Sequence, residues 1–194
     1  MSMPLDALSD VADDALLVLF ANGDRGAAQA LTLRLTPRAL GFAARMLGDR
    51  AEAEDVTQEA MLRLWKIAPD WRQGEAQVST WLYRVVRNLC TDRLRKKRGV
   101  GLDEIAEPLD DSPSAVEVML NEGRAAALRQ ALAALPERQR EAVILRHIDG
   151  LSNPEIAEIL EITTEAVESL TARGKRSLTA MLAGKRNELG YTDE

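Results

Sequence analysis

The sequence predicts an all-α protein made of two small helical domains joined by a flexible acidic linker, with a helix-turn-helix in the C-terminal domain. Three observations support this prediction. Only 4% of residues are aromatic in a chain that is 46% apolar, so Leu, Ala and Val must fill the cores, which favours helices over a β-sandwich. Apolar residues recur with helical spacing through most of the chain. After Arg98, as far as Asn121, the sequence contains several acids, two prolines and no Lys or Arg, a composition typical of a tether.

The N-terminal part of the chain is predicted to form consecutive helices. Residues 11–40 suggest two helices separated by the turn signal at residues 22–24. Pro37 lies inside the second segment, where its ring and missing N–H predict a break or a kink. The helical pattern continues to Gly48, which suits a C-cap, and Asp49 suits the N-cap of a further helix.

The helix after Asp49 carries a polar face with one large apolar residue in it. This face contains, at positions i, i+3, i+4 and i+7, the residues Asp55, Gln58, Glu59 and Leu62. Two interpretations remain open. The face is either a solvated acidic surface, or a docking surface in which Leu62 is an exposed anchor ringed by acceptors. The second arrangement suits a basic partner with an apolar pocket at its centre.

A basic helix between Trp81 and Arg98 is the main functional signal. One face is apolar, and the other gathers Arg84, Arg87, Asn88, Thr91, Arg95 and Arg98. From Arg84 to Arg98 seven Lys/Arg residues accompany a single Asp, in a chain whose formal net charge is -6. Trp81, Tyr83 and the polar loop 72–80 precede this run. Charge, stackable rings and a hydrogen-bonding loop together favour single-stranded nucleic acid, over a solvated helix end that only complements the helix dipole.

The C-terminal part has the spacing of a helix-turn-helix. Helical periodicity resumes at about Asn121 and continues, across one proline, to Gly150. Residues 152–155 combine a cap, a first-turn proline and a reciprocal Glu, which predicts the start of a short helix. Apolar residues then recur as they do in a support helix followed by a recognition helix, whose outer face is free for the major groove. Glu161 occupies the turn, where a glycine is usual.

Composition excludes several classes of function. One Cys and one His leave no disulfide framework and no Cys/His metal site. No Gly-rich phosphate loop, catalytic acid pair or activated nucleophile is present, so we expect neither an enzyme nor a cofactor. The N-terminus has no signal pattern, and no apolar run approaches the length of a membrane span. We therefore expect a cytoplasmic protein with no membrane insertion and no small-molecule substrate.

The chain resembles the bacterial extracytoplasmic-function (group 4) sigma factors of the sigma-70 family. The resemblance covers about residues 12–182, and its closest matches are GDRAEAEDVTQEAMLRLWK (48–66), STWLYRVVRNLCTDRLRKKR (79–98) and LPERQREAVILRHIDGLSNPEIAEIL (135–160). It implies a non-catalytic subunit that directs RNA polymerase to promoters. The implied domains are region 2 in residues 1–98, a flexible acidic linker in 99–120, and region 4 with a short tail in 121–194.

The resemblance also implies three groups of site residues. Core RNA polymerase would bind Asp55, Gln58, Glu59, Leu62 and Arg63. The promoter -10 element would be recognised, opened and held by Arg72, Gln73, Gln77, Ser79, Thr80, Trp81, Arg84, Arg87, Asn88, Thr91, Arg93, Arg95, Lys96, Lys97 and Arg98. The -35 element would be recognised by Ser152, Thr164, Glu165, Glu168, Ser169, Ala172, Arg173, Lys175 and Arg176. The chain departs from the family at Glu168 and Leu170, where Lys and Arg are common, and Glu168 could instead accept from a cytosine amino group.

The resemblance implies three partners: core RNA polymerase, promoter DNA and a cognate anti-sigma factor. The anti-sigma factor would hold the protein inactive until a stress signal arrives. The alternative is a stand-alone helix-turn-helix regulator that dimerises through its N-terminal helices. The net charge of -6 argues against this alternative, because the acidic tether and the face around Asp55 would repel duplex DNA. A gel shift with and without core polymerase separates the two.

Overall fold

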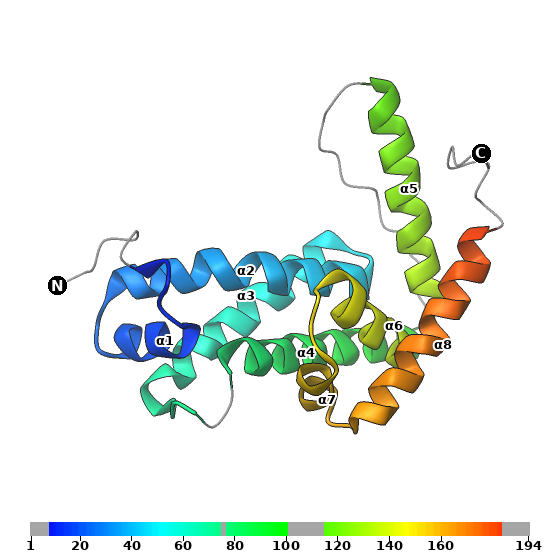
Figure 1. The fold of residues 1–194 in the computed structure, drawn as a ribbon. Coiled ribbons are helices and arrows are strands. Elements are labelled where there is room, and N and C mark those ends of the chain that lie inside the picture. Colours follow the sequence, from blue (N-terminus) through cyan, green and yellow to red (C-terminus); the bar gives the residue numbers. More distant parts are fainter. Residues whose placement is uncertain (1–7, 75–76, 101–114, 184–194) are drawn as a thin grey trace.

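The computed structural model describes residues 8–74, 77–100 and 115–183, which form helices joined by short turns (Figure 1). The N-terminal group contains α1 (Asp13–Ala21), α2 (Arg25–Leu47), α3 (Arg50–Ile67), the short 3-10 turn η2 (Ala68–Asp70) and α4 (Val78–Val100). The C-terminal group contains α5 (Ala115–Ala134), α6 (Glu137–Val143), the π-helical turn η3 (Ile144–Ile148), α7 (Asn153–Leu160) and α8 (Thr164–Ala183). These described ranges contain no strand, and the predicted all-α class is confirmed.

Local capping residues set the ends of α2 and α3 where the sequence predicted. Gly48 ends α2 in the left-handed conformation, with φ of 68°, a conformation that costs glycine little. Asp49 then accepts a hydrogen bond from the amide of Glu52 at 3.0 Å and begins α3. Asp24 caps α2 in the same way through two backbone amides. Each boundary therefore depends on residues only a few positions apart.

Of the break or kink predicted at Pro37, the break is wrong. α2 continues from Arg25 to Leu47 with Pro37 inside it. Proline removes one backbone hydrogen bond from a helix interior. On either side of it, however, Leu35 and Ala39 are buried in the core, so one apolar stripe extends along the whole helix. Packing of this stripe against α3 and α4 outweighs the local preference for a break.

The region predicted as a linker falls only partly within the described residues. α4 continues to Val100, and α5 begins at Ala115 instead of near Asn121. The rest of the linker predicted for residues 99–120, which is residues 101–114, lies outside the described ranges.

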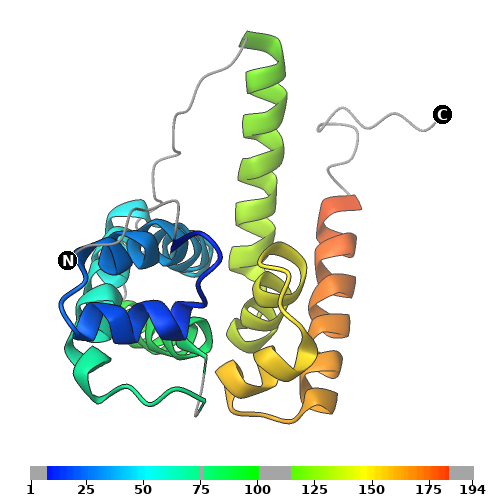
Figure 2. The ribbon, with the colours of Figure 1, turned by 60° about the vertical axis from the view of Figure 1, so that its left-hand side comes forward.

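The two helical groups lie side by side and contact each other directly (Figures 1 and 2). α4 packs on α7, and α2 packs on both α5 and η3. Within the C-terminal group, α8 packs on α5, α6 and α7. The basic helix α4 is therefore enclosed on one side by α2 and α3 and on another by the C-terminal group.

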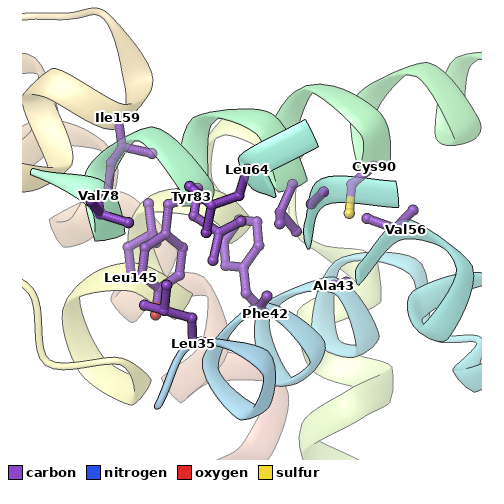
Figure 3. Close-up of a cluster of buried hydrophobic side chains, with 14 of the residues drawn as sticks. Leu35, Phe42, Ala43, Val56, Leu64, Val78, Tyr83, Cys90, Leu145 and Ile159 are labelled. Atoms are coloured by element: carbon purple, nitrogen blue, oxygen red, sulfur yellow. The ribbon is translucent and has the colours of Figure 1, made fainter. Parts of the chain in front are cut away.

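One hydrophobic core continues across the boundary between the two groups (Figure 3). In the N-terminal group the ring of Tyr83 packs edge-on against Phe42, with centroids 5.6 Å apart. Leu145 and Ile159, which come from the C-terminal group, are buried in the same cluster near Val78. Because these side chains would meet water if the groups separated, apolar burial stabilises the docked arrangement.

Candidate nucleic-acid and protein interfaces

The polar face of α3 borders an apolar groove between α2 and α3. Asp55, Gln58, Leu62 and Arg63 are exposed on this face and Glu59 is half-buried; the exposed fraction of Leu62 is 60%. The groove has a volume of about 350 Å³ and is lined by Thr32, Thr36, Leu40, Glu54, Thr57, Gln58, Met61, Leu62 and Trp65. The sequence pattern identified the contribution of α3 but missed that of α2, because the groove exists only where the two helices pair.

Ion pairs within the N-terminal group involve several residues that were assigned to partners. The carboxylate of Glu59 pairs with Arg63, one turn further along α3. Arg93, expected to hold phosphate, instead donates to Glu52 at 2.6 Å and lies 3.8 Å from Asp55. The hydrogen bond that Arg93 donates to Glu52 is the main reason that the pKa of Arg93 is raised.

Further along α4 the cations differ in their surroundings. Lys97 lies 3.8 Å from Asp49 and 3.9 Å from Glu52 on α3. Arg95 is exposed and lies 3.8 Å from Asp92 on its own helix. Lys96 is exposed as well. The end of α4 therefore offers cations to solvent, while Lys97 also leans towards α3.

The start of α4 differs from the expected loop in two respects. The helix begins at Val78, whose amide donates to Asp14 at 3.0 Å, so Ser79 and Thr80 belong to its first turn. Thr80 is buried and Ser79 half-buried, whereas Arg72, Gln73 and Gln77 are exposed.

The two aromatic rings expected to stack on bases have different environments. Trp81 is half-buried and packs edge-on against Trp71, with centroids 6.3 Å apart. Tyr83 is buried in the core against Phe42, so the expectation that it offers a ring to bases is wrong. Helical periodicity places Tyr83 beside the apolar positions Leu82 and Val86. This position in the sequence was the signal that could have indicated its burial.

The polar face of α4 meets carboxylates of the C-terminal group, which the sequence did not predict. Arg87 Nε donates to Glu141 Oε1 at 3.0 Å, and Thr91 Oγ1 donates to Glu137 Oε1 at 3.0 Å. Two further ion pairs join Arg84 to Glu161 and Arg98 to Glu137. Asn88 stays exposed between these contacts. Thus most of the face assigned to the -10 element contacts protein in this structure.

The acids at this boundary occupy different environments. Glu141 has no exposed surface, and burial raises its pKa although the charge of Arg87 opposes the shift. Burial also acts to raise the pKa of Glu137, but hydrogen bonds from Arg98 and Thr91 outweigh it and lower the pKa. At the edge of the boundary, Arg45 Nη1 lies 3.3 Å from Asp149 Oδ1.

The predicted helix-turn-helix is formed by α7 and α8. Ser152 and Glu155 make the predicted capping box at the start of α7, so the Ser152 hydroxyl is engaged within its own helix. Glu161 lies in the turn with a left-handed φ of 55°. Thr164 begins α8 and is half-buried. The rest of the expected -35 group is exposed on α8 and comprises Glu165, Glu168, Ser169, Ala172, Arg173, Lys175 and Arg176.

Two residues that the sequence analysis did not single out support α8. Asn153 Nδ2 donates to Glu168 Oε1 at 3.3 Å and so contacts a carboxylate on the exposed face. Gly174 is buried where α8 crosses α6, and a Cβ at that position would lie 2.5 Å from Val143 Cγ2. A glycine facing inward in the middle of an amphipathic helix is the signal that could have indicated this close crossing.

In the part of the chain that the structure describes, no group of three or more His, Cys, Asp or Glu residues is placed to hold a metal ion. Among the helices that the structure describes, none combines the length and the apolar character needed to cross a membrane.

Two family matches cover most of the helical chain. Residues 31–100 match the sigma-70 region 2 family, and residues 125–178 match the sigma-70 region 4 family.

Proteins with a similar sequence are also named RNA polymerase sigma factors. RNA polymerase sigma-H factor of Pseudomonas aeruginosa is 30% identical over 186 residues, covering 90% of this chain and 96% of the relative. The sigma factor SigW of Bacillus subtilis is 33% identical over 149 residues, covering 71% and 79%. SigM of Mycobacterium tuberculosis is 34% identical over 171 residues, covering 88% and 84%. The last two relatives are named as extracytoplasmic-function RNA polymerase sigma factors.

Solved structures with a similar fold include CnrH in complex with the cytosolic domain of CnrY, at a TM-score of 0.67 and 26% identity, covering 89% of this chain and 97% of the other. The sigma factor RpoE of Bartonella quintana, solved with the anti-sigma factor NepR, has a TM-score of 0.64 at 23% identity, covering 80% and 96%. The second likeness concerns the fold alone.

Proposed function

Since the chain belongs to the extracytoplasmic-function sigma factors of the sigma-70 family, it is a promoter-specificity subunit of RNA polymerase, and we propose that α3, α4 and α8 divide its work. In this proposal residues 1–98 form the domain that binds core polymerase and the -10 element, and residues 121–194 form the domain that recognises the -35 element. Residues 99–120 connect them. The protein has no catalysis of its own and acts in the cytoplasm.

Core polymerase docks on the exposed face of α3. The support for this assignment is the position of Leu62 at the edge of the apolar groove between α2 and α3, beside Asp55 and Gln58. An exposed apolar anchor that enters a pocket, with polar groups around it, has the composition of an interface hot spot. Glu59 and Arg63 contribute as a pair, so their net charge at this face is small.

Opening of the -10 element takes place along α4 and the loop before it. In this proposal the exposed residues Arg72, Gln73, Gln77 and Asn88 contact base edges, and Trp81 gives a partly exposed ring. Arg95 and Lys96, which are exposed, hold phosphates, which position the strand without sequence preference. Arg84, Arg87, Thr91 and Arg98 complete the face once their contacts with the C-terminal group are broken.

Recognition of the -35 element falls to the exposed face of α8. Arg173, Lys175 and Arg176 supply the positive charge near the middle of the helix. Glu168 lies closer to its N-terminal end, where side chains of a recognition helix usually contact base edges. A carboxylate accepts from the amino group of cytosine. We therefore assign to Glu168 a preference for a C·G pair in the -35 element.

A protein partner holds the chain inactive until a stress signal arrives. The solved structure of CnrH contains the cytosolic domain of CnrY, and the RpoE structure contains an anti-sigma factor. We extend the same kind of partner to this chain and expect a cognate anti-sigma factor.

The observation that carries the proposal is the presence, on one chain, of a polar α4 face rich in Arg and an outward-facing recognition helix. Run-off transcription with purified core polymerase tests it, with the 5′ ends of the transcripts sequenced to locate the promoters. We expect transcripts that start at defined sites only when the protein is added. A promoter gel shift of equal strength with and without core polymerase would instead support a stand-alone regulator.

A further inference from the structure

We propose that the docked arrangement is an autoinhibited state, in which carboxylates of α6 and of the α7–α8 turn occupy the promoter-opening face of α4. The inference rests on the proposed role of α4 at the -10 element. It adds that the free chain closes this face by itself, without a partner protein, and must open before the strand can bind.

The contacts at the boundary resemble those that a DNA strand would make. Guanidinium groups bind carboxylates and phosphates through the same fork of N–H donors. Arg84, Arg87 and Arg98 each donate through one guanidinium nitrogen to a carboxylate of the C-terminal group. Thr91 adds a hydrogen bond to one of the same carboxylates, that of Glu137. A phosphate strand and the C-terminal group therefore compete for one set of donors.

Burial makes this competition exclusive. The side chain of Glu141 is fully buried, and only 13% of the Arg87 side chain is exposed. Nearer the start of α4, Ile159 of α7 is buried close to Val78 in the core that the two groups share. A nucleotide cannot reach Arg87 while α6 and α7 stay in place, because protein atoms fill the space. Binding of the strand thus requires the two helical groups to separate.

Glu161 lies in the turn of the helix-turn-helix but forms an ion pair with α4 that the motif itself does not require. Its left-handed φ of 55° is a conformation that glycine adopts at little cost and other residues rarely adopt. The Glu161 carboxylate leaves the turn and reaches Arg84, which is 77 positions away in the chain. The pairing with α4 explains why an acid occupies a turn position that favours glycine.

Further contacts hold the groups together away from the α4 face. Arg140 Nη1 donates to the carbonyl of Met46 at 2.8 Å, and Arg45 pairs with Asp149. These contacts join α6 and η3 to the end of α2. Because these contacts remain when the exposed ion pair of Glu161 is lost, removal of the Glu161 charge should shift the equilibrium between docked and separated groups without unfolding either group.

The test compares two substitutions that remove the same charge from neighbouring positions. Glu161→Gln breaks the pair with Arg84. Glu158→Gln removes an exposed acid of α7 for which the structure describes no ion pair, and serves as the control. The double variant Glu137→Gln/Glu161→Gln releases Arg98 as well. Circular dichroism confirms that each variant is folded.

Opening is measured in the free full-length chain. Spin labels are placed on cysteines at Gln29 of α2 and Ala180 of α8, both exposed, in a Cys90→Ala background. Pulsed dipolar spectroscopy then gives the distance distribution. We expect one main distance for wild type and Glu158→Gln, and a second population in Glu137→Gln/Glu161→Gln that grows with added salt.

Access to α4 is measured by anisotropy with a short fluorescein-labelled single strand of random sequence. Breaking one exposed pair should raise affinity about 2–5-fold for Glu161→Gln relative to Glu158→Gln, and more for the double variant. A double variant with the wild-type distance distribution and the same affinity as the control overturns autoinhibition. Run-off transcription with core polymerase is assayed in parallel. If transcription succeeds while the double variant keeps the distance distribution and the single-strand affinity of the control, the proposed function stands and the autoinhibition is wrong. If wild type and variants all fail in transcription, the proposed function is wrong.

Discussion

Arg87 of α4 donates through Nε to the carboxylate of Glu141 of α6 at a distance of 3.0 Å, and Glu141 is completely buried. This pair links the two helical groups. Burying a carboxylate is costly unless a cation and hydrogen bonds compensate it, and Oε2 of Glu141 has no hydrogen-bond partner. The pair therefore favours one mutual position of the groups more than it stabilises them.

Removing the charge of Glu141 should change how stability depends on pH. Burial raises the pKa of Glu141, against the charges of Arg87 and Arg138. A carboxyl with a raised folded-state pKa contributes stability in full below its unfolded value of about 4.3, and this contribution is lost as pH rises through the folded value. Urea unfolding at several pH values should thus show wild type losing stability relative to Glu141→Gln as the pH rises above about 4.3. A difference that stays constant with pH contradicts this, and Glu158→Gln serves as the exposed control.

Cys90 should be inert towards thiol reagents in the folded protein. Its side chain is fully buried, and burial raises the pKa of the thiol to about 12. Because the thiolate is the reactive form, labelling at pH 8 must wait for unfolding or a large opening. Ellman's reagent should react slowly in buffer and fully in denaturant, while a cysteine placed at exposed Gln29 reacts at once. Fast labelling of Cys90 in buffer would contradict its place in the core.

Gly174→Ala should destabilise the C-terminal group. The new Cβ would lie 2.5 Å from Val143 Cγ2 and 3.2 Å from the carbonyl oxygen of Gln139. Such overpacking costs about 1–3 kcal/mol, part of which the better helix propensity of Ala offsets. Thermal unfolding followed by circular dichroism should show a lower midpoint. Gly123→Ala on α5 meets no atom within 4 Å and should raise stability instead. Equal effects of the two changes would argue against a close crossing of α6 and α8.

Leu62→Ser should weaken binding to core polymerase by more than tenfold. Residues that anchor an interface commonly contribute about 2 kcal/mol or more, which corresponds to a factor of roughly 30. Leu33→Ser is the matched control, because Leu33 is 63% exposed and Leu62 is 60% exposed, but only Leu62 lines the groove. Biolayer interferometry with immobilised core polymerase measures both. Similar losses for the two variants would remove the groove from the interface.

Lys96→Ala and Asn88→Ala should fail in different ways on promoter DNA. Lys96 is exposed, and we propose that it holds a phosphate, so its loss should weaken complexes on all sequences and reduce the salt slope by about 0.7–0.9. Asn88 faces solvent where a base edge can reach it, and its loss should change preference at one or two -10 positions, at about 1–3 kcal/mol for a base. Binding of holoenzyme to a set of single-base promoter variants at several salt concentrations measures both. If Asn88→Ala retains wild-type preference, it does not contact a base.

Features that depend on near neighbours were predictable from the sequence. The apolar face of α4, the cap at Asp49, the end of α2 at Gly48 and the capping box of Ser152 all involve residues less than about two helical turns apart. The family resemblance then assigned the exposed faces of α3 and α8 to partners, and the family matches confirm the class of protein. These signals require no knowledge of which helices touch.

Only the tertiary structure decided how the helices meet. The continuity of α2 through Pro37 depends on packing against α3 and α4, and burial of Tyr83 depends on its contact with Phe42. The pairs Arg87–Glu141 and Arg84–Glu161 join positions 54 and 77 residues apart. Periodicity shows that α4 has a polar face but gives no information on what that face contacts. An arginine side chain binds a protein carboxylate or a DNA phosphate through the same N–H donors. Only the packing of the apolar faces brings the carboxylates of the C-terminal group within reach of the arginines of α4.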